Sequence, residues 1–458
     1  MKTKHILLLL LTLAQPTLHA QELTLEQART LALEQNKDIR KSQLTLEQTR
    51  HDVAAYKANY YPKLNLMAAD FYSTAKGDLS ITGGNLPIFT LNPTTGTYVP
   101  NVTPHPDGTY TLNQYALFPD KTIEYKVQNI LIAGLQLQQP LYMGGKVGTA
   151  YRMSKIGQQM AADNITLTRA QVILRTDEAY VQAVRASQLA NVARHYKSLL
   201  DELKKNVESA VHHGLRTRND LMKVQVRLNE AELSIQRADN GYTLACMNLA
   251  HVIGTDHAEP SDTTFANFLT LAPDAQLSLR PEHSILQHKA DLAAEQVRLT
   301  DSDFLPNLAL LAGYSYANGG QVNGRKFIDS GSAYVGVTFK WNVLNFGERT
   351  HKIRSARAKQ QLAQLELEDA DEKMTLELRQ ARNHWDEAQT EVRLTQSALQ
   401  QAAENLRLSR SNYDAGLEPL SDLLEAQALW QKAAADAVEA QCQQLLAHTR
   451  YLKAAGAL

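Results

Sequence analysis

The chain has few cysteines and few aromatic residues. Only Cys246 and Cys442 occur among its 458 residues, and aromatic residues make up 7%. Two thiols cannot form a disulfide framework, and both lie inside helical patterns, so we expect buried free thiols. The low aromatic share, together with abundant Ala, Leu, Gln, Glu and Arg, favours long helices.

A dominant charge and a catalytic motif are also missing. The chain has 47 Lys and Arg against 48 Asp and Glu, and no basic stripe alternates with aromatic residues, which makes nucleic acid a poor candidate partner. No Ser/His/Asp or paired-carboxylate arrangement stands out, so we expect neither enzyme activity nor a cofactor. The stretch "MGGK" (143–146) lacks the flanking Gly and Ser/Thr of a phosphate loop and predicts a strand-to-helix turn. The adjacent His212 and His213 would point in different directions on a helix, which argues against a metal site.

One long apolar run lies at the start of the chain. Residues 1–20 combine Lys2 and Lys4, an apolar stretch and a small residue before Gln21, which is the layout of a secretory signal peptide. No run of 18 apolar residues follows, which excludes a transmembrane helix in the mature chain. We therefore expect an exported protein that starts at Gln21 and, with no cysteine at that point, carries no lipid anchor.

The chain repeats itself with an offset of 202 residues. The stretch 214–225 recurs at 416–427, with Gly, Leu, Asp, Leu and Gln at matching positions, and Gly254 falls on Gly456. Upstream the offset becomes 244, which implies an insertion of 42 residues in the first half. Periods this long indicate a duplicated unit rather than a solenoid repeat.

Each half reads as helix, strand, loop, strand, long helix, turn and helix. We expect a first repeat over 21–254, a connector over 255–280 and a second repeat over 281–458. The segment 77–120 is rich in Gly, Pro, Asn and Thr, which predicts a long loop between the first two strands.

Heptad patterns run through the helices on both sides of each turn. Apolar positions step by threes and fours from Leu189 to Ala210, and alanines recur every seven residues from Ala426 to Ala454. The pattern over 146–213 predicts a rod of roughly 100 Å. One such seam alone would suit a solvated antiparallel hairpin, but two register-matched hairpins favour a larger assembly.

Alternating residues predict four strands, each with one apolar face. The apolar sets begin at Leu64, Tyr125, Leu308 and Val335, and the strand that begins at Tyr125 runs to Gln139. Such strands suit either a soluble sheet covered on one side or a membrane-spanning barrel. The helices use their apolar seams on one another, so lipid is the natural cover for the strands. Because transmembrane barrels start at eight strands, copies of the chain must pool their strands.

Four stretches carry a resemblance to a known family. The segments 413–427 ("YDAGLEPLSDLLEAQ"), 214–225 ("GLRTRNDLMKVQ"), 36–39 ("NKDI") and 280–283 ("RPEH") resemble those of the TolC-type outer membrane efflux protein family. With the order of elements, the resemblance covers essentially the whole mature chain. It implies a membrane α/β fold: a homotrimer with a twelve-stranded transmembrane β-barrel, four strands per subunit, continued by a periplasmic α-helical coiled-coil barrel.

The resemblance also implies function and partners. Such proteins are passive exit ducts in the outer membrane of Gram-negative bacteria, for efflux of small molecules or for protein secretion. Expected partners are a periplasmic adaptor, an inner-membrane transporter and outer membrane lipid. The hairpin tips expected to contact the adaptor are Gly214, Leu215, Gly416 and Leu417.

The family pattern further implies where the tunnel closes. Asp422 and Glu425 match acidic residues that ring the narrow entrance, and Tyr413 and Asp220 match residues of links that hold the tip shut. Glu418 stands where the best-known member has an arginine, so one link is absent or replaced. The candidate substitute partners are Arg216 and Arg218.

Local helix chemistry explains part of this pattern without a gate. Thr217 and Asp220 form a helix-start signature, while Gly416 suits a helix end and Pro419 a first turn. For Asp220 we favour capping over gating. For the two acids beyond Pro419, threefold repetition would place at least six carboxylates around one axis, which would attract cations, so we favour an entrance role.

A second class of function stays open at this point. A non-channel periplasmic adaptor or scaffold would have the same coiled-coil seams, with its strands in a small soluble sheet. A requirement for detergent and the conduction of ions separate the duct from the scaffold.

Overall fold

The computed structural model describes residues 22–127, 129–261 and 280–458. The expected signal peptide, most of the expected connector (262–279) and Gln128 of an expected strand lie outside the described residues. The chain divides into two compact units. The described parts of Met1–Ala54, Tyr151–Val297 and Lys352–Leu458 form a helical unit, and those of Ala55–Ala150 and Arg298–His351 form a unit that contains the main sheet.

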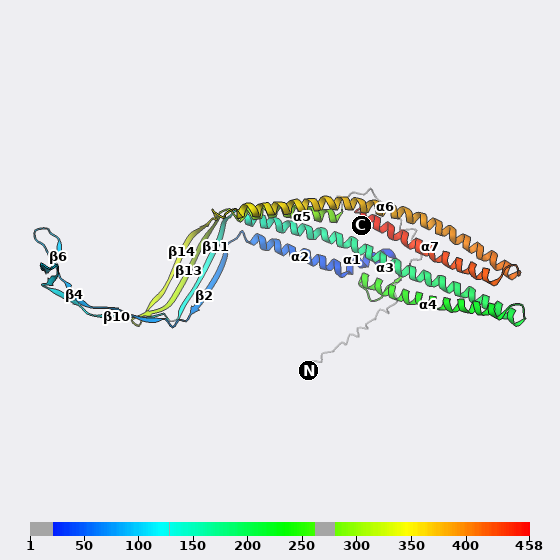
Figure 1. The fold of residues 1–458 in the computed structure, drawn as a ribbon, viewed down its shortest axis with the longest axis horizontal. Helices are drawn as coiled ribbons and strands as arrows, with labels where there is room; N and C mark the ends of the chain where they lie inside the picture. Colours follow the sequence, from blue (N-terminus) through cyan, green and yellow to red (C-terminus); the bar gives the residue numbers. More distant parts are fainter. Residues whose placement is uncertain (1–21, 128, 262–279) are drawn as a thin grey trace, which may run out of the picture. The chain divides into compact units, whose positions relative to one another are not determined.

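Long helices account for most of the described chain (Figure 1). No helix of this part has an apolar stretch long enough to span a bilayer. In chain order the helices are α1 (Leu25–Gln35), α2 (Lys37–Ala58), α3 (Lys146–His212), α4 (Arg218–Ile253), α5 (Pro281–Ser302), α6 (Glu348–Asp414) and α7 (Leu420–Ala454).

Helix bounds confirm the internal duplication. α3 and α6 have 67 residues each, which corresponds to a rod of about 100 Å. Their first residues are 202 positions apart, and so are the first residues of α4 and α7. The apolar periodicity therefore predicted both long helices and both turns.

Heptad positions supply the core between the two helical hairpins. Val224 and Leu228 of α4 are buried in one cluster with Leu420 and Leu423 of α7. The alanine seam of α7 is buried or half-buried, because small side chains let neighbouring helices approach closely. Burial here also covers Cys442, and desolvation raises the pKa of its thiol to about 12. Both cysteines are free, as predicted, but only Cys442 is buried, whereas Cys246 is half-buried.

A buried ion pair joins three helices elsewhere in the helical unit. The guanidinium of Arg29 (α1) donates from Nε to Asp177 Oδ1 (α3) at 2.7 Å and from Nη2 to Oδ2 at 2.6 Å. The Thr449 hydroxyl (α7) donates to Oδ2 at 2.6 Å. The Asp177 side chain is fully buried, and a charge in that position is tolerated because these donors satisfy both oxygens.

The N-terminal strand is fastened beside this ion pair. β1 (Glu22–Leu23) pairs in parallel with β12 (Glu259–Pro260). The Tyr180 hydroxyl of α3 donates to the Leu23 carbonyl oxygen at 2.7 Å. The start of the described chain is thus held to the segment that follows α4 and to a long helix.

Four long antiparallel strands form the main sheet of the other unit. These are β2 (Lys63–Phe71), β11 (Ile130–Met143), β13 (Asn307–Val322) and β14 (Arg325–Lys340). β11 pairs with β2 and β13, and β13 also pairs with β14. Their order across the sheet is therefore β2, β11, β13, β14.

Strand register places the expected apolar residues on one face. Leu66 lies opposite Leu135, Leu135 lies opposite Tyr314, and Tyr314 lies opposite Ala333. The neighbouring row on the same face is Leu64, Leu137, Ala312 and Val335. Directly opposed residues share a face, so the alternation in each separate strand merges into one apolar surface.

The expected strand over 125–139 is interrupted. β10 (Lys121–Lys126) ends before Asn129, and β11 begins after it. Asn129 has a φ of 45°, a left-handed conformation that a regular strand cannot contain. The "MGGK" turn is confirmed: Gly144 and Gly145 have positive φ values just before α3 begins.

The segment expected to be a loop contains short paired strands. They are β3 (Lys76–Ile81), β4 (Gly84–Pro87), β5 (Phe89–Leu91), β6 (Tyr98–Pro100), β7 (Val102–Pro104), β8 (Tyr110–Leu112) and β9 (Tyr115–Phe118), with β10 pairing β3. Gly96 and Gly108 occupy hairpin turns with positive φ. The prediction of one long loop was wrong because Gly, Asn and Pro are concentrated at the turns, whereas Tyr, Phe, Leu and Thr form the strands between the turns.

Candidate functional site

The two hairpin tips have the same backbone geometry. Gly214 and Gly416 have φ values of 71° and 75°. The next residue donates its backbone N–H back across the turn in each case: Leu215 to Ala210 O and Leu417 to Asn412 O, both at 2.8 Å. This is the glycine-dependent way to end a helix. Both leucine side chains are 77% exposed, so each tip presents an apolar residue to its surroundings.

The two helices that follow the tips start by different means. At α4 the Thr217 hydroxyl accepts from the Asp220 backbone N–H at 3.2 Å and donates to Asp220 Oδ2 at 2.8 Å. At α7 the N-cap is Pro419, and no side-chain cap forms. The capping interpretation of Asp220 therefore has a direct structural basis.

Asp220 is held in its charged form by this cap. The hydrogen bond from Thr217 is the main cause of the lowered pKa of its carboxyl, and the charges of Lys223 and Arg216 lower that pKa further. The Lys223 ammonium lies 3.9 Å from Oδ1. Asp220 thus remains ionised at a pH below the usual range for an aspartate.

Arg216 and Tyr413 connect the two hairpins at their tips. The Arg216 guanidinium lies over the Tyr413 ring, 4.7 Å from its centroid, which is the geometry of a cation–π contact. The ring is 8% exposed and packs in the cluster that contains Leu420 and Val224. Burial is the main cause of the raised pKa of the Tyr413 phenol. The sequence indicated both residues, but their pairing depends on how the hairpins pack.

Glu418 is bound within its own hairpin. Asn412 donates from Nδ2 to Oε1 at 2.9 Å, and the Ser409 hydroxyl donates to Oε2 at 2.7 Å. These two hydrogen bonds, led by that of Asn412, lower the pKa of the Glu418 carboxyl. Neither Arg216 nor Arg218 pairs with Glu418 within the described chain. The partners Ser409 and Asn412 had no recognisable signal in the sequence.

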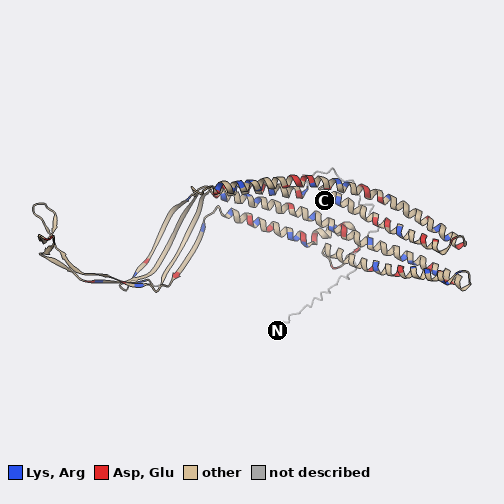
Figure 2. Cartoon of the chain, in the orientation of Figure 1, with Lys and Arg blue, Asp and Glu red and all other residues tan. Residues whose placement is uncertain are grey.

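Asp422 and Glu425 lie on the exposed face of the first turns of α7. The Ser421 hydroxyl donates to Asp422 Oδ1 at 2.9 Å. Among the described residues neither acid takes part in an ion pair. Figure 2 shows acidic residues gathered at the end of the α6–α7 hairpin. These two carboxylates are therefore available to solvent and to ions.

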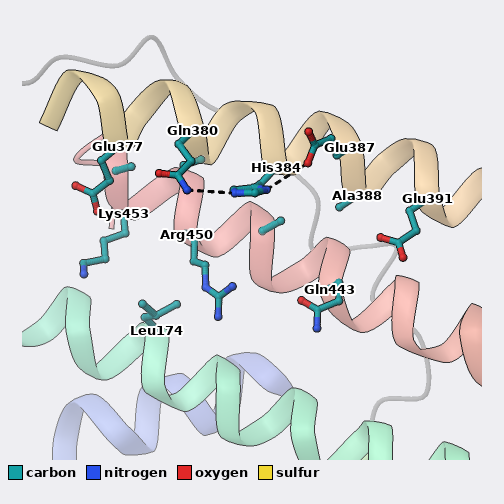
Figure 3. Close-up of a pocket in the computed structure, with 13 residues that line it drawn as sticks. Leu174, Glu377, Gln380, His384, Glu387, Ala388, Glu391, Gln443, Arg450 and Lys453 are labelled. Atoms are coloured by element: carbon teal, nitrogen blue, oxygen red, sulfur yellow. Dashed lines mark hydrogen bonds and ion pairs between the residues drawn. The ribbon is translucent and has the colours of Figure 1, made fainter. Parts of the chain in front are cut away.

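A separate groove of about 660 Å³ lies between α6 and α7 and is bordered by Leu174 of α3 (Figure 3). Its lining carries both signs of charge, from Glu377, Glu387 and Glu391 on α6 and from Arg450 and Lys453 on α7. His384 contacts Gln380 and Glu387 on its own helix. The groove combines no nucleophile with a base, and no cluster of three metal-binding side chains occurs among the residues that the structure describes.

The sheet and the hairpins together define a class of protein. A sheet with one apolar face, combined with two long helical hairpins of which one ends in an acidic tip (Figure 2), is the architecture of a membrane-anchored exit duct. A family model described as "Outer membrane efflux protein" matches residues 28–255 and 273–457. The chain therefore belongs to the outer membrane efflux protein family.

Known relatives agree with this assignment. The chain is 25% identical over 341 residues to the "Alkaline protease secretion protein AprF" of Pseudomonas aeruginosa, covering 71% of this chain and 70% of that protein. It is 24% identical over 310 residues to the "Outer membrane protein TolC" of Vibrio cholerae, covering 65% and 70%. The solved structure of the CusC channel superposes with a TM-score of 0.74 at 14% identity, over 95% of this chain and 92% of that one. The protein is an outer membrane channel, the exit duct of an efflux or secretion system.

The cap at the first tip predicts a pH dependence of local stability. Because the Asp220 pKa is lowered on folding, its contribution is fully present above the unfolded value of about 4 and is lost as the pH falls through the lower folded value. Hydrogen exchange in the first turn of α4, corrected for intrinsic rates, should accelerate in that acid range. Asp220→Asn should remove the pH dependence, and an unchanged profile in this variant would contradict the assignment.

Proposed function

We propose that three copies of the chain share one barrel and one tunnel. The observation that carries the proposal is a sheet with two free edges, since in the described chain β2 pairs only with β11 and β14 only with β13. In lipid, each free edge would leave backbone N–H and C=O groups unpaired. Four strands are too few to close, whereas twelve fall within the range of membrane barrels.

The apolar face of the sheet matches a bilayer in height. On β13 it extends from Leu308 to Tyr316, which is roughly 27 Å along the strand. At a tilt of about 40° this corresponds to about 20 Å of depth, close to the ~25 Å apolar band of outer membrane barrels. The row that contains Asp70 and Asp329 follows directly and marks the outer boundary of the band.

Exposed apolar residues on the helices support side-by-side packing of copies. They lie on the outer faces of α4 and α6. These faces do not contribute to the core of the single chain. The exposed set is Met222, Val226, Leu233, Leu244 and Met247 on α4, and Leu362, Leu365, Leu376, Leu394 and Leu408 on α6. Exposed apolar residues that recur along a helix in this way suit a surface that another protein covers.

The second tip supplies the selective element of the entrance. Three copies place Asp422 and Glu425 as six carboxylates around one axis. Neither residue forms an ion pair with the part of the chain that the structure describes, which supports this role because an unpaired carboxylate keeps its full charge for passing ions. A ring of this kind concentrates cations and repels anions at a narrow opening.

The contact between Arg216 and Tyr413 acts as a latch between the hairpins of one subunit. It joins the two tips directly at a buried ring, so separation of the tips breaks it. Glu418 does not replace the missing link, because Ser409 and Asn412 already occupy both of its oxygens. The cation–π contact between Arg216 and Tyr413 therefore holds the entrance closed.

Leu215 and Leu417 mark the surface for a periplasmic adaptor. Gly214 and Gly416 place these side chains at the outermost point of each tip, where they do not pack in the core. An inner-membrane transporter completes the system and selects the cargo. The duct itself supplies passage and no chemistry.

Ion conduction tests the duct itself. The mature protein should require detergent, have the mass of a trimer in it, and form discrete conducting channels in planar lipid bilayers. A mature protein that stays monomeric and soluble without detergent would instead support the scaffold function.

Removal of the acidic ring should reduce cation selectivity. We expect Asp422→Ala combined with Glu425→Ala to shift the reversal potential in a salt gradient towards zero and to weaken block by multivalent cations. Glu368→Ala combined with Glu372→Ala, which removes two exposed acids of α6 far along the chain from the tip, is the matched control. Equal selectivity in both variants and the unmodified channel would remove Asp422 and Glu425 from the constriction.

Loss of the latch should open the entrance more often. A half-buried cation–π contact contributes about 1 kcal/mol, so Arg216→Leu should raise the ratio of open to closed tips about fivefold for each subunit and increase the open fraction of the channel accordingly. Arg218→Leu, which removes the same charge two residues away, should have little effect. In a Tyr413→Leu background Arg216→Leu should add nothing, and an additive effect would rule out the direct contact.

A further inference from the structure

The insertion of the first repeat forms a distinct arm, residues 76–126, which comprises β3 to β10. It connects β2 to β11, whereas β13 and β14 are joined by a tight turn at Asn323 and Gly324. The helices α2 and α3 attach at the opposite ends of β2 and β11. Since those helices form the periplasmic tunnel, the arm lies at the extracellular end of the barrel.

Strand register gives the base of the arm one apolar and one polar face. Leu79 lies opposite Ile123, and Gly77 lies opposite Tyr125. The alternate pairs are Asp78 with Glu124 and Ser80 with Thr122. Because opposed residues share a face, the aliphatic and aromatic side chains lie on one side of this ribbon and the charged and hydroxyl side chains on the other.

Both outer hairpins of the arm have the same two-faced pattern. In the β5–β6 hairpin, Phe89 lies opposite Pro100 and Leu91 opposite Tyr98, with Thr90 and Val99 opposed on the other face. In the β7–β8 hairpin, one face contains Val102, Pro104, Tyr110 and Leu112, and the other contains Thr103 and Thr111. Tyr98 is 72% exposed and Tyr110 is 67% exposed. A two-stranded ribbon with an uncovered apolar face is marginal in water, so these faces require a cover.

The apolar face of the arm continues the lipid-facing surface of the barrel. Tyr125 of β10 lies opposite Val322 of β13, and Val322 lies opposite Arg325 of β14. Even spacing along β14 places Arg325 on the same face as Ala333, which lies opposite Tyr314, so Tyr125 shares the face of Tyr314 although Gly319 and Gly320 of β13 have positive φ values. One polar row, which contains Asp70 and Asp329, separates the two apolar zones. The arm thus begins at the boundary of the membrane, on the side of the sheet that faces lipid.

The direction of the arm and the composition of residues 77–120 indicate what covers its apolar faces. Beyond β10 the arm turns away from the direction of the long strands (Figure 1). A turn over the barrel mouth would point the apolar face to water, whereas a turn outward lays that face on the membrane. The lysines of the arm, Lys76, Lys121 and Lys126, all belong to its base, the β3–β10 ribbon. Residues 77–120 contain three Asp and no Lys or Arg, a composition suited to an interfacial environment in which Tyr and Phe act as anchors.

We propose that the arm lies on the outer leaflet of the outer membrane, with its apolar faces toward lipid and its threonine faces toward water. The arm then widens the lipid contact of each subunit at the extracellular rim and leaves the mouth of the duct uncovered. Covering their apolar faces with lipid is also what stabilises the β3–β10, β5–β6 and β7–β8 ribbons.

Spin-label accessibility in lipid tests this placement. Cysteines would replace Leu79 and Tyr98 on the apolar faces, and Ser80 and Thr90 on the opposite faces serve as matched controls in the same ribbons. Each variant is reconstituted into phosphatidylethanolamine–phosphatidylglycerol vesicles, where channel conductance confirms insertion. Unmodified protein corrects for labelling of Cys246 and Cys442.

The labels on the two faces should behave oppositely. Labels at 79 and 98 should be severalfold more accessible to oxygen than to a water-soluble nickel complex, with the reverse at 80 and 90, and the difference should disappear in a lipid-free amphipathic polymer. Equal nickel accessibility on both faces in vesicles would overturn the proposal. Strong dipolar coupling between labels at 98 of different copies would overturn it in favour of contact between arms.

Discussion

The structure depends on the requirement that backbone N–H and C=O groups be paired wherever a chain meets lipid. Within the four-stranded sheet the backbone groups between neighbouring strands are paired, but in the described chain β2 and β14 each have one edge without a partner strand. In the trimer that we propose, copies of the chain around one axis remove this single deficit. Once the strands are pooled, the long helices that begin at their ends are brought together as well, and the tunnel follows from the barrel.

Because of the duplication, each chain contains two copies of the same helical hairpin. The same offset separates the two long helices, the two turns and the two returning helices, so each subunit contributes two equivalent hairpins. The turns have retained their glycine geometry while their side chains have diverged. One tip caps its helix with Thr217 and Asp220, and the other begins its helix at Pro419 and leaves Asp422 and Glu425 unpaired. Equivalent backbones thus carry different side-chain interactions at the two tips.

Periodic features were predictable because their cause is local. Helix seams, strand faces and glycine turns depend on residues a few positions apart, which is why α3, α6 and the apolar sheet face agreed with expectation. The arm was not predictable as paired strands, because its strands have as few as three residues and acquire their identity only from their partners. The same limit applies to Glu418, whose hydrogen bonds come from Ser409 and Asn412 across a turn.

The sequence by itself determined the periodicities, the duplication and the positions of the turns, because each of these depends on spacing along the chain. It also determined which residues carry charge at the tips. Only the tertiary structure decided which of those charges are engaged. Packing of one hairpin against the other places Arg216 on the Tyr413 ring, and the fold of the second turn brings Asn412 to Glu418. These contacts join residues through space, where side-chain geometry and burial, rather than sequence spacing, select the partner.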